Sequence, residues 1–164
     1  MRRIDIAIII TLIVVVAGAV SFLAYRAIPG PLDHLAYQQA TIANESLKLY
    51  LPISPQAQTK GLGGVETLPK DQGMLFYMPG TDDPSIWMKD MLISIDAIWL
   101  NHEHRVVHIE HNLSPDTFPQ TFRNPPETTA RYVLELGSGE AMRLGIGMDD
   151  ELVFDGDIHE YLRN

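Results

Sequence analysis

The chain contains 164 residues, carries a formal net charge of −9 and has no cysteine. This length suggests one domain with additional segments. The acidic balance argues against nucleic acid or an anionic lipid surface as the main partner, because neither supplies counter-charge. Without cysteine the fold cannot use disulfides and depends on its hydrophobic core.

The first feature in chain order is an apolar segment of twenty uncharged residues from Ile6 to Tyr25. A helix of that length covers about 30 Å, the hydrocarbon thickness of a bilayer. Two arginines precede it, whereas residues 27–164 hold nine Lys/Arg and twenty Asp/Glu, a formal charge of −11. Basic flanks tend to stay in the cytoplasm. We therefore predict a single-pass transmembrane signal anchor over residues 1–27 that lies in the lipid bilayer. Its N-terminus is expected to be cytoplasmic and the C-terminal domain extracytoplasmic, either periplasmic or extracellular.

The same segment also resembles a cleaved secretory signal, because the small residues Ala17-Gly18-Ala19 follow the apolar run. The residues after Ala19 remain apolar as far as Ala24, which favours a retained anchor. Cleavage after Ala19 is the alternative, and it would deliver the domain to the same side of the membrane.

Residues 28–44 are expected to form a juxtamembrane linker, because Pro29-Gly30-Pro31 interrupts a helix. A short helix around residues 35–42 is compatible with the sequence. The extracytoplasmic domain is assigned to residues 45–155, and residues 156–164 to an acidic tail.

Within this domain, the hydrophobic pattern predicts seven short strands. They cover residues 47–53, 73–78, 86–91, 95–100, 105–111, 131–136 and 151–155. Two short helices are also expected: Ser54-Pro55 starts one, and Ser138 caps another over residues 139–144. Residues 112–130 contain four prolines and are expected to form a long loop. Together these elements predict a mainly β fold with two short helices, either a β-sandwich or a partly closed barrel.

Several segments of the domain, in this order and spacing, resemble one known family. They are Lys60-Gly61-Leu62-Gly63-Gly64, Leu68-Pro69, Gly73-Met74-Leu75-Phe76, Trp87-Met88-Lys89-Asp90, Ile95-Asp96-Ala97-Ile98-Trp99-Leu100, Arg131-Tyr132-Val133-Leu134-Glu135-Leu136 and Arg143-Leu144-Gly145-Ile146. The chain thereby resembles the domain-of-unknown-function family 192 over roughly residues 46–154. Lys60, Gly63 and Asp90 depart from the residues that are usual in the family. The resemblance implies a small, mostly β domain that often follows a signal or anchor, and it assigns no catalytic residue or function.

The most unusual cluster of side chains is Trp87-Met88-Lys89-Asp90. In a strand Trp87 and Lys89 point to one face, where stacking and a charged hydrogen bond could hold a sugar or peptide. We take Trp87, Lys89, Asp90 and Glu110 as the candidate ligand-binding residues. The alternative interpretation places Trp87 at the rim of the core and pairs Lys89 with Asp96 or Glu110.

No metal, cofactor or catalytic residue is expected. His102, His104, His108 and His111 lie in a turn or on opposite faces of a strand, so solvated histidines fit better than zinc ligands. Asp149-Asp150-Glu151, Asp155 and Asp157 lack EF-hand spacing. Gly137-Ser138-Gly139 lacks the full nucleophile-elbow pattern.

Three functions remain open from the sequence. The leading hypothesis is a non-catalytic binding or accessory module of the cell envelope, with a glycan, peptide or protein partner. A second is an envelope hydrolase of glycans or peptidoglycan that uses Asp90, Asp96 or Glu110 as acid and base. A third is a structural subunit of a membrane assembly, in which Ala17-Gly18-Ala19 packs against another helix.

Overall fold

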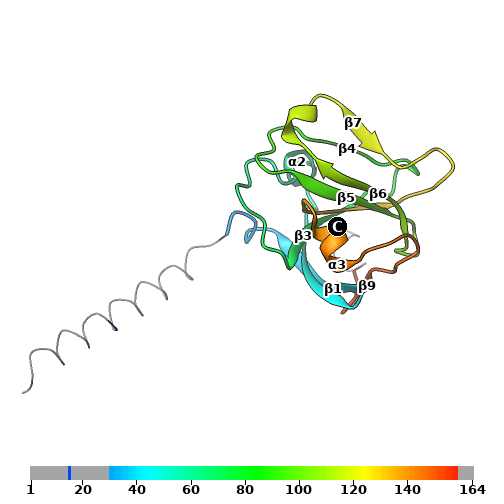
Figure 1. Ribbon diagram of the computed structural model, residues 1–164, viewed down its shortest axis with the longest axis horizontal. Coiled ribbons are helices and arrows are strands. Elements are labelled where there is room, and N and C mark those ends of the chain that lie inside the picture. The colour runs from blue at the N-terminus through cyan, green and yellow to red at the C-terminus, as the bar shows by residue number, and fades with distance from the viewer. Residues whose placement is uncertain (1–14, 16–29, 159–164) are drawn as a thin grey trace, which may run out of the picture. The chain divides into compact units, whose positions relative to one another are not determined.

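The computed structural model describes Val15 and residues 30–158 (Figure 1). The chain divides into two units, Met1–His34 and Leu35–Asn164, and the second is described here. Apart from Val15, the predicted transmembrane segment therefore lies outside the described residues. Among the residues that are described, no helix is long and apolar enough to cross a membrane.

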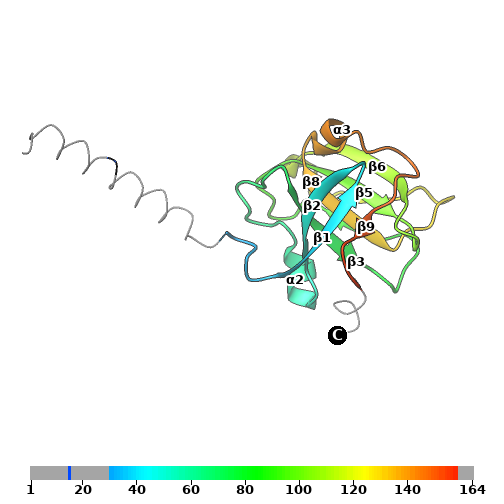
Figure 2. The same ribbon diagram turned by 90° about the horizontal axis from the view of Figure 1, so that it is seen from below.

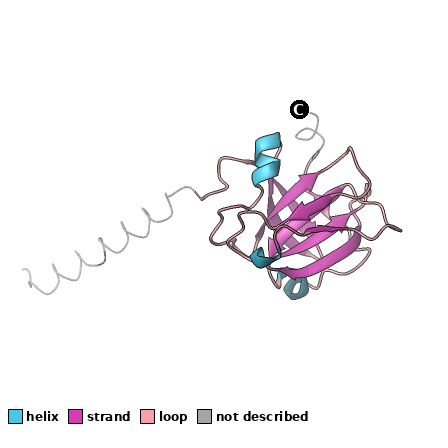
Figure 3. Cartoon of the chain, turned by 90° about the horizontal axis from the view of Figure 1, so that it is seen from above, coloured by secondary structure: helices cyan, strands magenta, loops and turns pink. Residues whose placement is uncertain are grey.

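The described residues form a mainly β domain with short helices. Its strands are β1 (Ala36–Ile42), β2 (Glu45–Leu51), β3 (Gln72–Tyr77), β4 (Ser85–Trp87), β5 (Ile95–Leu100), β6 (Val106–Leu113), β7 (Thr121–Arg123), β8 (Tyr132–Gly137) and β9 (Val153–Phe154). The helices are α2 (Pro55–Lys60), α3 (Glu140–Leu144) and the short 3-10 helix η1 (Pro115–Thr117). Figures 2 and 3 show α2 and α3 at opposite ends of the sheet.

Seven strands form one curled sheet in the order β6-β5-β8-β3-β2-β1-β9, and β4 pairs with β7 in a separate two-stranded sheet. All pairs in the large sheet are antiparallel except β2 with β3. The two outer ends of the sheet approach each other at an isolated bridge between Arg105 and Glu151. There the amide of Val106 donates to the carbonyl of Asp150 at 2.9 Å. The sheet is thus a curled half-barrel, which confirms the mainly β prediction.

Strand β1 replaces the linker or short helix that was expected at residues 35–42. It pairs with β2 along its whole length, from Ala36 opposite Leu51 to Ile42 opposite Glu45. The two residues between the strands, Ala43 and Asn44, have φ values of 50° and 65°. Two positive φ values in a two-residue loop match the twist of a tight hairpin. The hairpin therefore makes residues 36–42 part of the domain.

The main core lies on one face of the curled sheet. It is built from side chains that alternate along the central strands and are 0–2% exposed, such as Leu49, Leu75, Ile98, Leu134 and Leu136. These positions follow the period of two that a strand imposes on its side chains. The sequence pattern located β5 with the same bounds, residues 95–100, as the structure has.

Helix α3 begins differently from the prediction. Its N-cap is Gly139, and no side chain of the neighbouring sequence caps it. Ser138, the expected cap, donates its hydroxyl to Oδ1 of Asn112 at 2.6 Å instead. A buried amide of the first helical turn is satisfied from β5, because Oδ2 of Asp96 accepts from the amide of Ala141 at 2.9 Å.

Two other predictions need correction. The strand expected over residues 86–91 is only three residues long, because the chain turns after Trp87. Residues 112–130 are not a structureless loop, since they contain η1 and β7.

Candidate functional site

A pocket of about 430 Å³ lies where α2, β4, β7 and the middle of the large sheet meet. Five segments that are far apart in the sequence line it. Their lining residues include Lys60, Leu62, Phe76, Ile86, Trp87, Lys89, Met91, Thr121 and Glu135. Most of these side chains are apolar, and three of them, Lys60, Lys89 and Glu135, are ionisable.

Glu135 reaches the pocket because of the register of β8. It is paired with Met74 of β3 on one side and with Ala97 of β5 on the other. Its chain neighbours Leu134 and Leu136 face the main core, and side chains alternate along a strand, so Glu135 lies on the opposite face of the sheet. Directly opposite residues in antiparallel strands share a face, so Met74 and Ala97 lie on the same face as Glu135. Ala97 in turn pairs with Glu110 of β6, which places the two glutamates on the same face, about 10 Å apart at the backbone.

The Glu135 side chain is buried although it is charged in water at neutral pH. It is 5% exposed, and within residues 30–158 no hydrogen bond or ion pair reaches its carboxyl group. Burial raises the pKa of Glu135 from 4.5 to about 8, because a low-dielectric environment disfavours the ionised form. At pH 7 the pocket therefore contains a neutral carboxylic acid, which can both donate and accept a hydrogen bond.

The rim of the pocket carries a tryptophan and two lysines. Trp87 is 45% exposed, and Nζ of Lys89 lies 6.0 Å from the centre of its ring. Lys60 is the last residue of α2, and Gly61 ends the helix with φ 51° beside Phe76. A Cβ at position 61 would lie 3.2 Å from the Phe76 ring, so the glycine serves both the turn and the pocket wall. Within residues 30–158 neither Lys60 nor Lys89 forms an ion pair.

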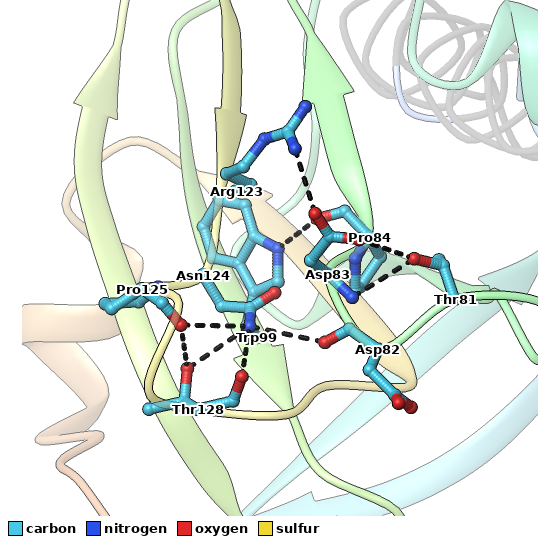
Figure 4. A network of polar contacts seen from close by, with 9 residues as sticks. All are labelled: Thr81, Asp82, Asp83, Pro84, Trp99, Arg123, Asn124, Pro125 and Thr128. Atoms are coloured by element: carbon cyan, nitrogen blue, oxygen red, sulfur yellow. Dashed lines mark hydrogen bonds and ion pairs between the residues drawn. The ribbon is translucent and has the colours of Figure 1, made fainter.

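Strand β4, which carries Trp87, is fixed to the sheet by a buried tryptophan (Figure 4). Nε1 of Trp99 donates to the carbonyl oxygen of Pro84, immediately before β4, at 2.8 Å. Trp99 is fully buried on β5 and lies on the same face as Glu135. The Trp99 indole therefore links the start of β4, which lines the pocket, to strand β5 of the large sheet.

A second set of contacts in Figure 4 holds β7 beside β4. Asn124, which follows β7, donates from Nδ2 to the carbonyl oxygen of Thr128 at 2.9 Å. Arg123 donates to Oδ2 of Asp83 at 2.9 Å, and the Thr81 hydroxyl donates to Oδ1 of the same carboxylate at 2.7 Å. The Thr81 hydrogen bond, with the Arg123 charge, lowers the pKa of Asp83. These contacts preorganise both strands of the wall without using any pocket residue.

The structure brings two of the four predicted ligand-binding residues together. Trp87 and Lys89 both line the pocket, whereas Asp90 and Glu110 do not. Asp90 is exposed in a turn with φ 57°, and its carbonyl oxygen accepts from the amide of Gly64. Glu110 is half-buried and lies 3.1 Å from Nε2 of His108.

The alternative pairing of Lys89 is not found. Asp96 is fully buried and accepts from the amides of Asn112 and Ala141, each at 2.9 Å. Its cross-strand partner is Leu136, so Asp96 faces the main core, on the side of the sheet opposite Glu110. Asp90, Asp96 and Glu110, the carboxylates suggested for hydrolysis, therefore occupy three separate environments.

The four histidines have separate contacts. His102 pairs with Glu103, His108 contacts Trp99 and Glu110, and His111 lies 3.9 Å from Asp96. His104 is not a solvated turn residue, because its ring packs edge-on against Tyr132 and Phe154. In the part of the chain that the structure describes, no group of three or more His, Asp or Glu side chains is placed to hold a metal.

Comparison with known proteins identifies the family. The family model DUF192, described as "Uncharacterized ACR", matches residues 38–154. The chain belongs to this family. The match begins within β1, so the DUF192 domain includes the strand that sequence analysis assigned to the linker. No curated protein matches the sequence.

Two solved structures are similar to this DUF192 domain. One is a protein from Sinorhizobium meliloti described as a "putative transcription regulator", with 25% identity and a TM-score of 0.67 over 73% of this chain and 95% of that one. The other is a protein of unknown function from Novosphingobium aromaticivorans, with 27% identity and a TM-score of 0.65 over 74% of this chain and 88% of that one. Both likenesses support the curled β fold.

Glu135 was not predicted as a site residue, although it lies in a segment that carries the family resemblance, Arg131–Leu136. The available signal was a single carboxylate inside the apolar strand Tyr132–Gly137. Such a residue in a strand buried on both faces is an exception that requires a partner or a function. Four of the segments that carry the family resemblance meet at the pocket, through Lys60, Phe76, Lys89 and Glu135.

Proposed function

We propose that the DUF192 domain of this chain is a binding module that takes a small ligand in the pocket beside Trp87. The observation that carries the proposal is the Glu135 carboxyl, which lines the pocket, is 5% exposed and has no hydrogen-bond partner within residues 30–158. A carboxyl group that is held at low exposure without a protein partner is costly to a fold, so its retention favours a ligand in the pocket that completes it.

The pocket wall supports the same proposal. Its volume falls within the range of about 300–1,000 Å³ that small-molecule sites occupy. An exposed indole beside apolar side chains offers area for stacking, and a few polar groups around it supply orientation. Because hydrogen bonds outside the pocket hold β4 and β7, little ordering is required on binding.

A binding role fits the site better than hydrolysis by the carboxylates suggested from the sequence. Such hydrolysis needs two carboxyl groups about 5–10 Å apart across one cleft. Asp96 faces the core and is satisfied by two backbone amides, whereas Asp90 and Glu110 lie outside the pocket. Among the described lining residues, Glu135 supplies the one carboxyl group.

The test is a binding screen of the full-length chain by NMR, using millimolar sugars, amino acids and small aromatic acids. A ligand of this pocket should shift the indole Nε1–H signal of Trp87. Trp87→Leu should weaken its binding at least tenfold, because stacking area and the rim are lost. Tyr37→Leu is the matched control, since Tyr37 is a similarly exposed aromatic residue (51%) outside the pocket. Ligands that bind Trp87→Leu and the parent chain equally would contradict the proposal.

We further propose that the apolar N-terminal segment tethers the module to the outer side of a membrane, at the cell envelope. The support is the charge distribution: two arginines precede the segment and a formal charge of −11 follows it. Because the chain lacks cysteine, single cysteines can report its topology. A membrane-impermeant maleimide should label Glu66→Cys, at an exposed position of the domain, on intact cells. Asp5→Cys should label only after lysis, and the reverse pattern would contradict the tether.

A further inference from the structure

The charges around the pocket differ from those of the rest of the chain. The protein carries a formal charge of −9, yet both ionisable groups at the pocket rim are lysines. Lys60 and Lys89 come from α2 and from the turn after β4, and both are exposed. Within residues 30–158 no carboxylate pairs with either ammonium group. Two unpaired cations at one rim attract an anion.

The one acid in the lining does not cancel these charges at pH 7. Burial raises the pKa of Glu135 to about 8, so its carboxyl is neutral there and does not repel an anion. The register places five other ionisable side chains on this face of the sheet, and none of them lines the pocket. His108 and Glu110 contact each other on β6, and Lys48 lies over the rings of Tyr37 and Tyr50 on β1 and β2. A cationic ligand would instead meet two lysines and a neutral acid.

Apolar side chains make up much of the remaining lining, beside the polar residues Gln58, Thr59, Ser85 and Thr121. Phe76, Ile86 and Met91 are buried and line the pocket, and the Trp87 ring stands at the rim. A flat apolar body gains most from such a surface, by burying area and stacking on the indole.

We propose that the pocket takes a small organic anion with a planar apolar body, whose anionic group is held by Lys60 and Lys89 and whose body lies against Trp87. This inference rests on the proposed function and specifies the class of ligand. The neutral Glu135 carboxyl, at the floor, is available to donate a hydrogen bond to a polar atom of the bound molecule.

The test uses three probes of similar shape and different charge: phenylacetate, 2-phenylethanol and 2-phenylethylamine. The full-length chain is held in phosphatidylcholine nanodiscs, which keep its apolar segment soluble and add no net charge. Each probe is titrated at pH 7 while the Trp87 indole signal is followed by NMR. Phenylacetate should bind about tenfold more tightly than the alcohol, since hydrogen bonds to charged groups are the stronger ones. The amine should bind most weakly.

Two outcomes separate this inference from the function on which it rests. Tighter binding of the amine or the alcohol at Trp87 would overturn the anion assignment and leave a ligand pocket standing. Failure of all three probes to shift Trp87 would count against both.

Substitutions locate the charges responsible. Lys60→Gln and Lys89→Gln should each weaken phenylacetate binding about tenfold and leave 2-phenylethanol binding unchanged. Lys70→Gln is the matched control, because Lys70 is exposed in a turn outside the pocket. If phenylacetate affinity fell equally in all three variants, the loss would come from the change in net charge. That result would overturn the assignment of Lys60 and Lys89 as the groups that hold the anion.

The pH dependence supplies an independent test. Phenylacetate affinity should fall as the pH rises through about 8, because an ionised Glu135 would repel the anion. Glu135→Gln should remove this decline, because an amide does not ionise. Affinity that rises with pH in the parent chain would overturn the proposal.

Discussion

Two buried carboxyl groups on neighbouring central strands have opposite surroundings. Asp96 on β5 faces the main core and accepts hydrogen bonds from the amides of Asn112 and Ala141, each at 2.9 Å. Glu135 on β8 faces the other side of the sheet and lines the pocket, where no group within residues 30–158 bonds its carboxyl. The pairing of Asp96 with Leu136 and of Ala97 with Glu135 fixes these opposite directions.

The hydrogen-bond partners of a buried acid distinguish a structural residue such as Asp96 from one such as Glu135, which is available to a ligand. Burial alone does not distinguish the two residues, which are 0% and 5% exposed. Their partners do. Asp96 joins β5 to the end of β6 and to the start of α3, so the fold uses its hydrogen-bonding capacity. The capacity of Glu135 remains open to a molecule in the pocket.

The largest expected effect comes from removing the satisfied acid. Asp96→Ala would leave the amide of Asn112 and the buried amide of Ala141 without their acceptor and would loosen the start of α3. We expect a loss of about 3–5 kcal/mol in the free energy of unfolding, measured by urea denaturation. Asp155→Ala, at an exposed aspartate, should change it by less than about 0.5 kcal/mol. An Asp96→Ala chain as stable as this control would show that Asp96 has no structural role.

Replacing the unsatisfied acid should have the opposite sign. The folded chain keeps the Glu135 proton up to about pH 8, whereas the unfolded chain releases it near pH 4.5. Unfolding between these values releases a proton, so stability falls as the pH rises, by about 1.4 kcal/mol per pH unit. Glu135→Gln should remove this slope and stabilise the chain at pH 8 by about 2–4 kcal/mol.

The control for this prediction is Glu110, which lies two strands from Glu135 on the same face of the sheet. Glu110→Gln alters a half-exposed glutamate on the same face and should change stability by less than about 1 kcal/mol. Its stability should retain the slope of the parent chain between pH 4.5 and 8. If Glu110→Gln lost the pH dependence of stability and Glu135→Gln kept it, Glu110 and not Glu135 would be the residue that titrates.

A smaller effect is expected from the contact that supports the pocket wall. Trp99→Phe removes the hydrogen bond from the indole to the Pro84 carbonyl and should cost about 1–3 kcal/mol. It should also weaken ligand binding, because β4 would be held less firmly. Trp87→Phe is the matched change in the exposed indole and should leave stability within about 0.5 kcal/mol of the parent chain. Similar unfolding curves for the two variants would contradict the supporting role of Trp99.

Local signals in the sequence predicted much of the fold. The Ser54-Pro55 start of α2 is confirmed, since Oγ of Ser54 accepts from the amide of Ala57 at 3.1 Å. The alternating or continuous apolar runs located β2, β3, β5 and β8. Strand β1 was missed because three of its seven residues are polar and its hairpin turn, Ala43-Asn44, lacks glycine. Its stability comes from pairing with β2, which composition alone does not reveal.

The candidate site was predictable only in part. Trp87 and Lys89 stood out because they are adjacent in the chain and unusual in type. Lys60 and Glu135 join them only through the pairing of distant strands and the placement of α2, which no local pattern encodes. In the sequence, Asp96, Glu110 and Glu135 are alike, because each is a carboxylate within a strand. Only the strand register shows that Asp96 caps α3, that Glu110 lies at the surface and that Glu135 lines the pocket.

The most direct test of this account is a pH titration of the Glu135 carboxyl carbon by NMR, with Glu110 as a reference in the same sample. We expect a midpoint near pH 8 for Glu135, because burial disfavours its ionised form. Saturating phenylacetate should move that midpoint upward, since a bound anion favours the protonated acid. A Glu135 midpoint between about 4 and 5, unchanged by the probe, would contradict the account.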